Sequence, residues 1–350
     1  MFGKKDNLIG LDIGSRTIKV AEVQHTKRGY FLKNFGMVDL PFDAISEGSI
    51  KEPEVVSETI KGLIRDLNIR EQNVAVSVAG FSVIIKKISI NKMSDEELSE
   101  SIQWEAEQYI PFDIEDVNID FEILGENEQN PNMMNVMLVA AKKSIIDEYI
   151  DILQMSNLNP CVIDLDVFAM QNIYELNYTS EDESVALIDI GANKMNINII
   201  KGNISDFTRD VSIGGDQITR EIASRLECTL EEAEDVKLGK NEGKLSNDEI
   251  RDITTPIISG WCSEIRQAID FFYSTFTDET ISRIVLSGGG AQTPGFLELL
   301  AHETSLDVEV CNPFNAIEIN QKRLDSNYLT RIGPQATICM GLALRKVDDK

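Results

Sequence analysis

A repeated pattern of strand, Asp-Ile-Gly turn and second strand constrains the fold of this chain more than any other feature. In the first copy an apolar run ends in Asp12-Ile13-Gly14 and continues into an alternating segment that reaches residue 23. In the second copy the run ends in Asp189-Ile190-Gly191 and the alternation continues to residue 200. Alternation with a period of two predicts β-strands, so each copy predicts a hairpin with an aspartate at its turn. Two such hairpins half a chain apart predict two related halves that face each other.

The two turns have the chemistry of a site for a nucleoside triphosphate and a metal ion. Gly14 and Gly191 lack side chains, so phosphate oxygens can approach the amide groups of both turns. Asp12 and Asp189 would face each other, and two carboxylates repel phosphate unless Mg²⁺ lies between them, usually bound through water. Lys19 can neutralise β- or γ-phosphate oxygens. The pattern therefore predicts a magnesium–nucleotide cleft between the halves.

A third turn strengthens this prediction against a simpler alternative. Asp and Gly are common in ordinary hairpin turns, so one copy alone would indicate little. Ser287-Gly288-Gly289-Gly290 follows a predicted strand at 281–286 and precedes a helix, and such a turn lets a flat base or ribose lie against the backbone. It is neither a G-x-G-x-x-G turn nor a Walker A loop. Ser15 can add a hydroxyl donor to the phosphate site.

Two further features belong to predicted helices of the second half. Gly214 and Gly215 open a helix that runs to about Leu226. Glu234 and Lys237 lie one helical turn apart. A pair with this spacing is usually a solvated ion pair, and the spacing alone indicates no binding role.

Composition limits the partners of the chain. Its 350 residues suffice for two domains, and 33 basic against 59 acidic residues give a net charge of −26. Such a charge repels nucleic acid and anionic lipid, so we expect no nucleic-acid partner. Five scattered cysteines indicate reduced thiols, and two histidines argue against a zinc site. We expect no membrane-spanning helix and no secretory signal, since no run of about 18 apolar residues and no apolar leader occur.

The segment 88–159 is predicted to be a small α+β insertion in the first half. It contains Trp104, Tyr109, Ile110 and Phe112 around Pro111. We expect this aromatic cluster to pack in the core of the insertion. Exposure would instead indicate a protein-binding surface.

Taken in order, these segments resemble the actin, Hsp70 and FtsA superfamily. Residues 12–19 resemble its first phosphate loop, residues 189–195 its second and residues 286–295 its adenosine motif. Ala233-Glu234 and Lys237 resemble the A-E-x-x-K helix that contacts adenosine in FtsA-like members. The resemblance implies an α/β, actin-like (RNase H-like, duplicated) two-domain fold with an FtsA-type α+β subdomain inserted in the first half, and ATP with Mg²⁺ as ligands.

The resemblance also implies the residues of the site. Asp12 and Asp189 would hold Mg²⁺, through water. The residues expected to bind the nucleotide are Asp12, Gly14, Ser15, Arg16, Lys19, Asp189, Gly191, Asn193, Gly214, Gly215, Glu234, Lys237, Gly288, Gly289 and Gly290.

The expected subdomains follow from the same resemblance. We expect an actin-like subdomain 1A from residues 1–87, 160–180 and 334–350, and an inserted subdomain 1C from residues 88–159. Residues 181–212 and 281–333 would form subdomain 2A, and residues 213–280 the helical subdomain 2B. The last helix is expected to start at Gly333-Pro334 and to end near Arg345.

Three stretches are similar to signatures of the PilM family of type IV pilus assembly proteins: residues 79–87, 103–112 and 120–125. This resemblance implies a cytoplasmic protein held at the inner membrane by its partner. The implied partner is the short cytoplasmic N-terminal tail of PilN, a single-pass protein, bound in a groove between subdomains 1A and 1C. Communication with the pilus motor ATPases is implied as well.

Hydrolysis of the nucleotide is a separate question. In the superfamily a residue on the helix that closes the first domain orients the attacking water. Asp166 is our candidate, with Asp164 second; the alternative is a helix-capping aspartate. We expect turnover to be slow or absent without partners. An FtsA-like, filament-forming cytomotive ATPase is the alternative function, although we see no C-terminal amphipathic helix to anchor it. A sugar or acetate kinase would need an acceptor site with a catalytic base, and we find no such constellation.

Overall fold

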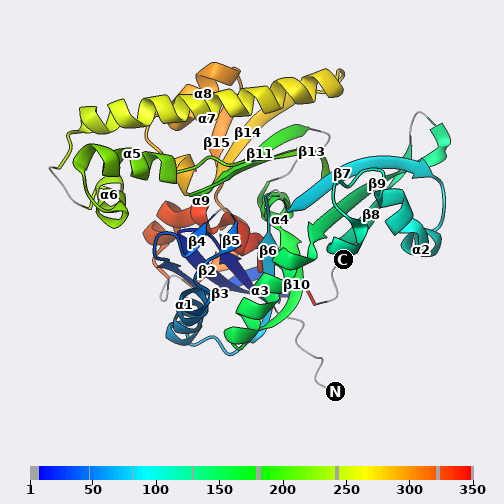
Figure 1. Ribbon diagram of the computed structural model, residues 1–350, viewed down its shortest axis with the longest axis horizontal. Coiled ribbons are helices and arrows are strands. Elements are labelled where there is room, and N and C mark those ends of the chain that lie inside the picture. Colours follow the sequence, from blue (N-terminus) through cyan, green and yellow to red (C-terminus); the bar gives the residue numbers. More distant parts are fainter. Residues whose placement is uncertain are drawn as a thin grey trace.

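Two sheets with the same strand arrangement form the body of the molecule (Figure 1). The computed structural model describes residues 8–46, 48–80, 82–127, 130–178, 183–240, 244–320 and 324–347. The first sheet has the order β10-β6-β1-β2-β3-β16 and the second the order β13-β12-β11-β14-β15. The first sheet consists of β1 (Ile9–Ile13), β2 (Thr17–Thr26), β3 (Gly29–Asp39), β6 (Asn73–Val78), β10 (Asn159–Leu165) and β16 (Ile317–Ile319). The second consists of β11 (Ser184–Ile190), β12 (Met195–Lys201), β13 (Ile204–Val211), β14 (Ile281–Ser287) and β15 (Asp307–Val310).

The two sheets are copies of one topology. β1, β2 and β3 are antiparallel, and β6 and β10 continue the sheet on the other side of β1 as parallel strands. β11, β12 and β13 are antiparallel in the same way, with β14 and β15 parallel beyond β11. Each predicted Asp-Ile-Gly hairpin is therefore the first hairpin of its sheet, with its aspartate next to the end of the central strand.

Two helices pack between the sheets and join them. They are α4 (Asp166–Asn177) and α9 (Ser326–Leu342). Met170 and Tyr174 of α4 pack against the second sheet, while Ala169 packs with residues of the first sheet and of α9. The helices approach so closely that a Cβ atom on Gly341 would lie 1.8 Å from the Ala169 carbonyl oxygen. Glycine is therefore required where α9 crosses α4.

The remaining helices of the body cover the outer faces of the sheets. Residues of α1 (Pro53–Asp66) and α3 (Lys143–Met155) form one core with the first sheet. A second large core joins the second sheet to four helices, which are α5 (Asp216–Leu226), α6 (Leu230–Lys237), α7 (Asn247–Thr275) and α8 (Phe296–Thr304). The short elements are β4 (Ile45–Ser46), β5 (Ser49–Ile50) and the 3₁₀ turns η1 (Ile114–Asp116) and η2 (Gly289–Gln292).

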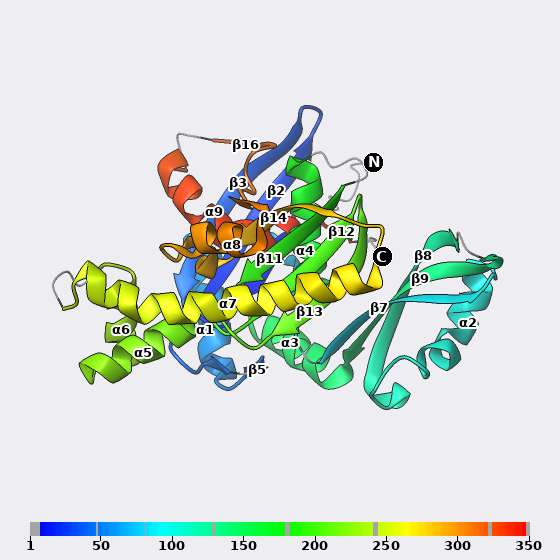
Figure 2. The same ribbon diagram turned by 90° about the horizontal axis from the view of Figure 1, so that it is seen from above.

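The insertion is a three-stranded sheet with one helix, and it projects to one side of the body (Figure 2). Its strands have the order β7-β9-β8, with β7 (Val83–Asn91), β8 (Val117–Asn127) and β9 (Asn130–Lys142). The helix α2 (Asp95–Ala106) begins at a capping box in which Ser94 and Glu97 exchange hydrogen bonds, and it packs Leu98 and Ile102 on the sheet. The insertion thus has a core of its own.

The structure corrects several predicted boundaries. The boundary at residue 88 falls inside β7, and α3 packs in the core of the first sheet instead of the insertion, because its apolar face meets α1. β16 pairs with β3 of the first sheet, although residues 281–333 were expected in subdomain 2A.

The start of the last helix was also predicted wrongly. α9 begins at Ser326, capped by the Asp325 side chain, and Pro334 lies inside it. Gly333-Pro334 is typical of a helix start, but here the Pro334 carbonyl accepts hydrogen bonds from the Gly288 amide and the Ser287 hydroxyl. Pro334 thus lies inside the helix and binds the third glycine turn through its carbonyl oxygen. Residues 1–7 and 348–350 of the expected subdomain 1A lie outside the described residues.

Candidate functional site

The two Asp-Ile-Gly turns have the same backbone geometry. The Gly14 amide donates to the Thr17 carbonyl at 3.1 Å, and the Gly191 amide donates to the Lys194 carbonyl at 2.9 Å. A Cβ atom on Gly14 would lie 3.0 Å from the Thr17 oxygen, and one on Gly191 would lie 3.3 Å from the Lys194 oxygen. Glycine therefore keeps both turns tight and their backbones bare, which is the arrangement that phosphate binding requires.

The aspartate of the first turn already has a counter-ion. Asp12 and Lys19 are opposite each other in the β1–β2 register, and Lys19 Nζ lies 2.8 Å from Asp12 Oδ2. Both side chains are buried. Burial lowers the pKa of Lys19, but the charge of Asp12 and its hydrogen bond outweigh burial and raise the pKa overall. The lysine thus stays charged at the base of the first turn.

The aspartate of the second turn differs in this respect. Asp189 pairs in register with Asn196, a neutral residue, and within the described ranges no cation forms an ion pair with Asp189. Burial raises the pKa of Asp189 to about 6, and the charges of Asp166 and Asp12 also raise it. A hydrogen bond with Ser287 and the charge of Lys19 lower the pKa by less. The site therefore has an excess of negative charge at Asp189.

Asp166 connects the two halves. It is the first residue of α4 and is buried, with Oδ1 accepting from Ser77 Oγ at 2.5 Å and Oδ2 lying 2.7 Å from Lys194 Nζ. Burial raises the pKa of Asp166, but Lys194 and the Ser77 hydroxyl outweigh burial and lower the pKa overall. The alternative prediction of a helix cap is wrong, because Leu165 occupies the cap position and no side chain caps the helix.

Asp164, the second candidate, points elsewhere. Its Oδ1 accepts from the Leu165 amide at 2.7 Å, and its Oδ2 lies 3.4 Å from Arg345 Nε beyond the end of α9. Of the two aspartates, Asp166 is the one in contact with a residue of the second Asp-Ile-Gly hairpin, Lys194.

Arg16 of the first turn reaches the second half. Its guanidinium binds Asp216 in a bidentate manner, with Nε–Oδ1 at 3.0 Å and Nη2–Oδ2 at 2.6 Å, and it lies 3.4 Å above the centre of the Phe42 ring. Asp216 is the first residue of α5 and is buried. This pair closes the junction between the halves beside the first turn.

The Gly214-Gly215 turn packs directly on the second Asp-Ile-Gly turn. The Gly215 amide donates to the Gly191 carbonyl at 3.0 Å, and a Cβ atom on Gly214 would lie 2.5 Å from that same oxygen. Lys237 Nζ lies 3.4 Å from the Gly215 carbonyl and 2.6 Å from Glu234. The Glu234–Lys237 pair of α6 thus contacts the Gly214-Gly215 turn instead of lying free in solvent.

Thr219 completes this contact. Its hydroxyl lies 2.6 Å from Glu234 Oε2 and 2.8 Å from Lys237 Nζ. The Glu234–Lys237 pair is therefore held against α5, one turn after the Gly214-Gly215 turn.

The third glycine turn packs on the other side of the second turn. Gly288 has φ of +81°, and a Cβ atom there would lie 2.3 Å from the Ile190 carbonyl oxygen. A Cβ atom on Gly290 would lie 2.3 Å from Ile190 Cγ2, and one on Gly289 would lie 3.4 Å from the Gln335 amide. All three glycine turns of the second half therefore meet at residues 190–191. Ser15 and Asn193 are half-buried within the first and second turns.

Sequence reasoning missed several residues that complete these contacts, within each half or across the junction. They are Ser77, Lys194, Asp210, Asp216 and Thr219. Lys194 lies in the second turn itself and Asp216 follows Gly215, so their positions were a usable signal. No pattern in the sequence pairs Ser77 with Asp166, because 89 residues separate them.

The donor set fits a magnesium ion that is bound mainly by phosphate and water. Within the described residues no group of three or more His, Cys, Asp or Glu side chains is arranged to hold a metal. Mg²⁺ in nucleotide sites is usually held by one or two carboxylates together with phosphates and waters. Asp12 and Asp189 supply that number, and the unneutralised charge at Asp189 favours a cation.

Trp104 does not lie in the core, and this expectation is wrong. Its side chain is 76% exposed, whereas Ile110 is buried. The reason is helical geometry, since Leu98, Ile102 and Ala106 form the buried face of α2 and Trp104 lies on the opposite face. Tyr109 and Phe112 are only partly buried against the same core.

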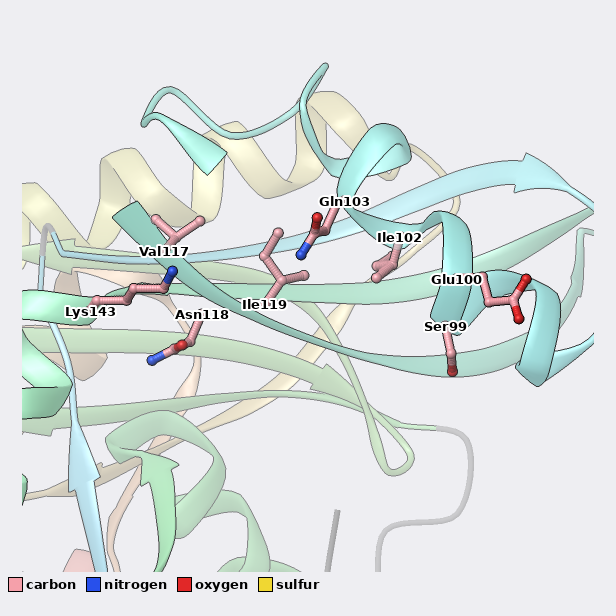
Figure 3. Close-up of a pocket in the computed structure, with 8 residues that line it drawn as sticks. All are labelled: Ser99, Glu100, Ile102, Gln103, Val117, Asn118, Ile119 and Lys143. Carbon is pink, nitrogen blue, oxygen red and sulfur yellow. The ribbon is translucent and has the colours of Figure 1, made fainter. Parts of the chain in front are cut away.

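A hollow of about 490 Å³ lies between α2, β8 and the start of α3 (Figure 3). It is lined by Ser99, Glu100, Ile102, Gln103, Val117, Asn118, Ile119 and Lys143. Lys143 Nζ donates to the Glu115 carbonyl at 2.6 Å. Seven of these eight residues belong to the insertion, and Lys143 is the first residue of α3, which packs in the core of the first half.

The duplicated sheets, the two helices between them and the paired Asp-Ile-Gly turns define an actin-like ATPase fold. The model of the family "Type IV pilus assembly protein PilM" matches residues 10–347, and the chain belongs to this family. The predicted fold class and the predicted family are both confirmed. Within the described ranges no helix has the length and apolar character needed to span a membrane.

Individual relatives agree with this assignment. A solved structure described as the PilM-PilN type IV pilus biogenesis complex has a TM-score of 0.86 and 28% identity, covering 98% of this chain and 99% of that one. The cell division protein FtsA of Bacillus subtilis (strain 168) is 24% identical, covering 93% of this chain and 82% of FtsA. MreB 5 of Spiroplasma citri bound to AMPPNP, with a TM-score of 0.53 and 11% identity over 97% of this chain and 95% of that one, shares the fold.

Proposed function

We propose that this chain is an ATP-binding scaffold of the type IV pilus assembly platform. In this proposal it docks the cytoplasmic N-terminal tail of PilN and couples the state of its nucleotide to that docking and to the pilus motor ATPases. It would act at the cytoplasmic face of the inner membrane, held there by its partner. One observation carries the proposal: the second Asp-Ile-Gly turn meets two further glycine turns. At its centre lies the buried Asp189, which has no ion-pair partner among the residues that the structure describes.

The glycine turns, which lack side chains, and the negative charge at Asp189 support binding of a nucleotide with a metal ion. The fifteen residues expected to bind ATP lie in the two Asp-Ile-Gly hairpins, the Gly214-Gly215 turn, the third glycine turn and α6. Mg²⁺ would bind between Asp12 and Asp189, bring ATP phosphates to the turns that contain Gly14 and Gly191, and relieve the charge at Asp189. Arg16 would have to exchange Asp216 for phosphate if it contacts the nucleotide, because both partners compete for one guanidinium.

Slow hydrolysis is part of the proposal. Asp166 is the candidate for orienting the attacking water, yet its two oxygens are engaged by Ser77 and Lys194. A carboxylate held in this way has little capacity left to accept a proton from water. We therefore expect a binding protein with at most slow ATPase activity.

A chain of contacts supports coupling between the nucleotide site and the insertion. Asn196, opposite Asp189 in the sheet, donates to Asp210 Oδ1 at 2.7 Å, and Asp210 Oδ2 accepts from the Gly80 amide at 2.8 Å. Gly80, with φ of +95°, lies in the link that leads from β6 into β7 of the insertion. A change at the second turn can therefore alter the position of the insertion.

A second contact reinforces this link nearer the surface. Lys87 of β7 lies 2.6 Å from Asp206 of β13, so the strand that carries Asp210 is bound to the insertion at two points. The Lys87 side chain is 32% exposed, so solvent screens this ion pair, and we assign the larger part of the coupling to Asp210.

The hollow in Figure 3 is our candidate for the tail-docking groove. It extends along the insertion to Lys143 at the start of α3, and it combines apolar side chains of Ile102, Val117 and Ile119 with polar ones. Backbone hydrogen bonds and apolar pockets are the usual means of holding an extended peptide.

Two measurements test the function. Calorimetry should show binding of ATP in the presence of Mg²⁺, and a peptide copy of the PilN tail should bind with an affinity that changes when MgATP is added. Asn118→Ala should weaken the peptide without altering ATP binding. A protein that binds neither ATP nor the peptide would refute the scaffold function.

The relationship to FtsA keeps the filament-forming alternative open to a direct test. A cytomotive protein should pellet at micromolar concentration with MgATP and remain in the supernatant without nucleotide. A scaffold should remain in the supernatant under both conditions.

A further inference from the structure

The outward face of α2 carries an exposed aromatic residue between carboxylates. Trp104 is 76% exposed, the largest exposed fraction among the large apolar side chains of the described residues. Glu100 lies four residues before it and Glu107 three residues after it, so the three side chains share one face of the helix. We call Glu100, Trp104 and Glu107 the α2 ridge. The ridge borders the hollow of Figure 3, because Glu100 also lines that hollow.

The charge around the ridge has a single sign. Residues 95–107 contain no Lys or Arg, and they contain six acidic residues, namely Asp95, Glu96, Glu97, Glu100, Glu105 and Glu107. Glu97 is used in the capping box at the start of the helix. Across the described ranges, no ion pair involves Glu100 or Glu107. The ridge therefore presents uncompensated carboxylates on both sides of an indole ring.

The neighbouring aromatic residues show what the ridge lacks. Lys86 Nζ lies 5.8 Å above the Tyr109 ring, and Lys142 Nζ lies 4.4 Å above the Phe112 ring. Trp104 has no ring or cation contact with any residue that the structure describes. Tryptophan is the strongest partner for a cation among the aromatic side chains. The chain thus supplies its own lysines to two aromatic rings and leaves the best cation-binding ring open.

We propose that the α2 ridge binds a basic segment of a partner protein, with an Arg or Lys side chain on the Trp104 ring between Glu100 and Glu107. A second copy of this chain does not fit, since each copy has a net charge of −26. Nucleic acid and anionic lipid are repelled for the same reason. This surface goes beyond the proposed function, because it requires no nucleotide and shares only Glu100 with the hollow assigned to the PilN tail.

A short blocked peptide of alternating Gly and Arg residues is a suitable probe. It should bind the wild-type protein in a salt-sensitive manner. Trp104→Ala should weaken the binding about two- to five-fold, which is the range for an exposed cation–π contact, and Trp104→Tyr should retain most of it. Glu100→Gln and Glu107→Gln should each weaken it by a similar factor. A matching peptide of Gly and Glu should not bind.

A control on the same helix separates the ridge from general attraction to an acidic protein. Glu105→Gln removes the same charge one-quarter turn away, outside the ridge, and should leave the affinity nearly unchanged. Equal effects of Glu105→Gln and Glu107→Gln, together with full binding by Trp104→Ala, would overturn the proposal. Thermal unfolding of each variant should match the wild type, because all four side chains lie outside the core of the insertion.

Binding of the PilN tail is measured on the same variants so that the two proposals can be separated. The tail should bind Trp104→Ala as it binds the wild type. Loss of tail binding in this variant would show that the ridge belongs to the tail-binding site, and it would overturn the proposal of a separate surface. Failure of the tail to bind even the wild type would count against the proposed function and leave the arginine-peptide result to decide the ridge.

Discussion

Lys19 and Asn196 occupy the same register position in the two copies of one hairpin, and only Lys19 gives its aspartate a counter-ion. Lys19 lies opposite Asp12 at 2.8 Å, whereas Asn196 lies opposite Asp189 and donates to Asp210 instead. The duplicated site is therefore asymmetric in charge. The first half is neutralised within the chain, and the second half retains a buried carboxylate that a cation would stabilise.

This asymmetry predicts opposite effects for the same substitution in the two copies. Asp189→Asn should stabilise the nucleotide-free protein by up to about 3 kcal/mol at neutral pH, because it removes a charge whose pKa burial and two acidic neighbours raise to about 6. Binding of MgATP should nevertheless be lost. Chemical unfolding and calorimetry measure the two quantities, and a destabilised Asp189→Asn protein would contradict the assignment.

Asp12→Asn provides the matched control. It leaves the buried Lys19 ammonium without its carboxylate, and breaking a buried pair costs about 3 kcal/mol. This variant should also lose MgATP binding, but with a less stable fold. If both variants changed stability in the same direction, the charge asymmetry would play no part.

The pH dependence of stability should show the same carboxylate. Asp189 has a pKa of about 6 in the folded protein against an ordinary value of 3.8, so between these values the folded state binds more protons than the unfolded state. The stabilising contribution of Asp189 to the free energy of unfolding is therefore fully present below about pH 4 and is lost as the pH rises through 6. Unfolding free energies in EDTA, without nucleotide, should fall over this window more steeply in the wild type than in Asp189→Asn. Parallel curves for the two proteins would exclude this titration.

The hairpins were predictable from the sequence because their signals are local. Alternating apolar residues on each side of an Asp-Ile-Gly turn determine strand, turn and register within about fifteen residues. Contacts across the junction were not predictable, since Arg16 and Asp216 are separated by 200 positions and either residue alone is typical of a solvated surface. Trp104 was misplaced because an aromatic residue near Pro111 indicates packing in most chains, and only the helix face decides its exposure.

The start of α9 shows a different limit. Gly333-Pro334 is typical of a helix start, yet the helix continues through it because tertiary contacts at Pro334 and the close packing of α9 dominate over local preference. Such a contact depends on Ser287 and Gly288, almost fifty residues earlier, and no local pattern records it.

Two glycines in helices predict opposite responses to alanine. Gly341→Ala would place a Cβ atom 1.8 Å from the Ala169 carbonyl oxygen where α9 crosses α4, so we expect a loss of about 3 kcal/mol or more. Gly260→Ala lies in α7 with no atom within 4 Å of the added Cβ, and should stabilise the protein by about 1 kcal/mol. Denaturant unfolding compares them directly. A neutral Gly341→Ala would mean that the helices separate more easily than their packing indicates.

The last prediction concerns the link between the nucleotide site and the insertion. Asp210 joins Asn196, opposite Asp189, to the Gly80 amide at the entry to β7. Asp210→Ala removes both hydrogen bonds at once. The change that MgATP causes in the binding free energy of the PilN tail should therefore be less than half of its wild-type value. The affinities for ATP alone and for the tail alone should stay within about three-fold, because Asp210 touches neither proposed binding site.

A neighbouring ion pair serves as the control for this measurement. Asp206→Ala removes only the contact with Lys87 near the surface, which should contribute less than 1 kcal/mol to the position of the insertion. Coupling should therefore persist in Asp206→Ala and decline in Asp210→Ala. Equal coupling in both variants and the wild type would show that the nucleotide affects the insertion through other contacts. Loss of tail binding in Asp210→Ala without nucleotide would show that Asp210 shapes the groove itself.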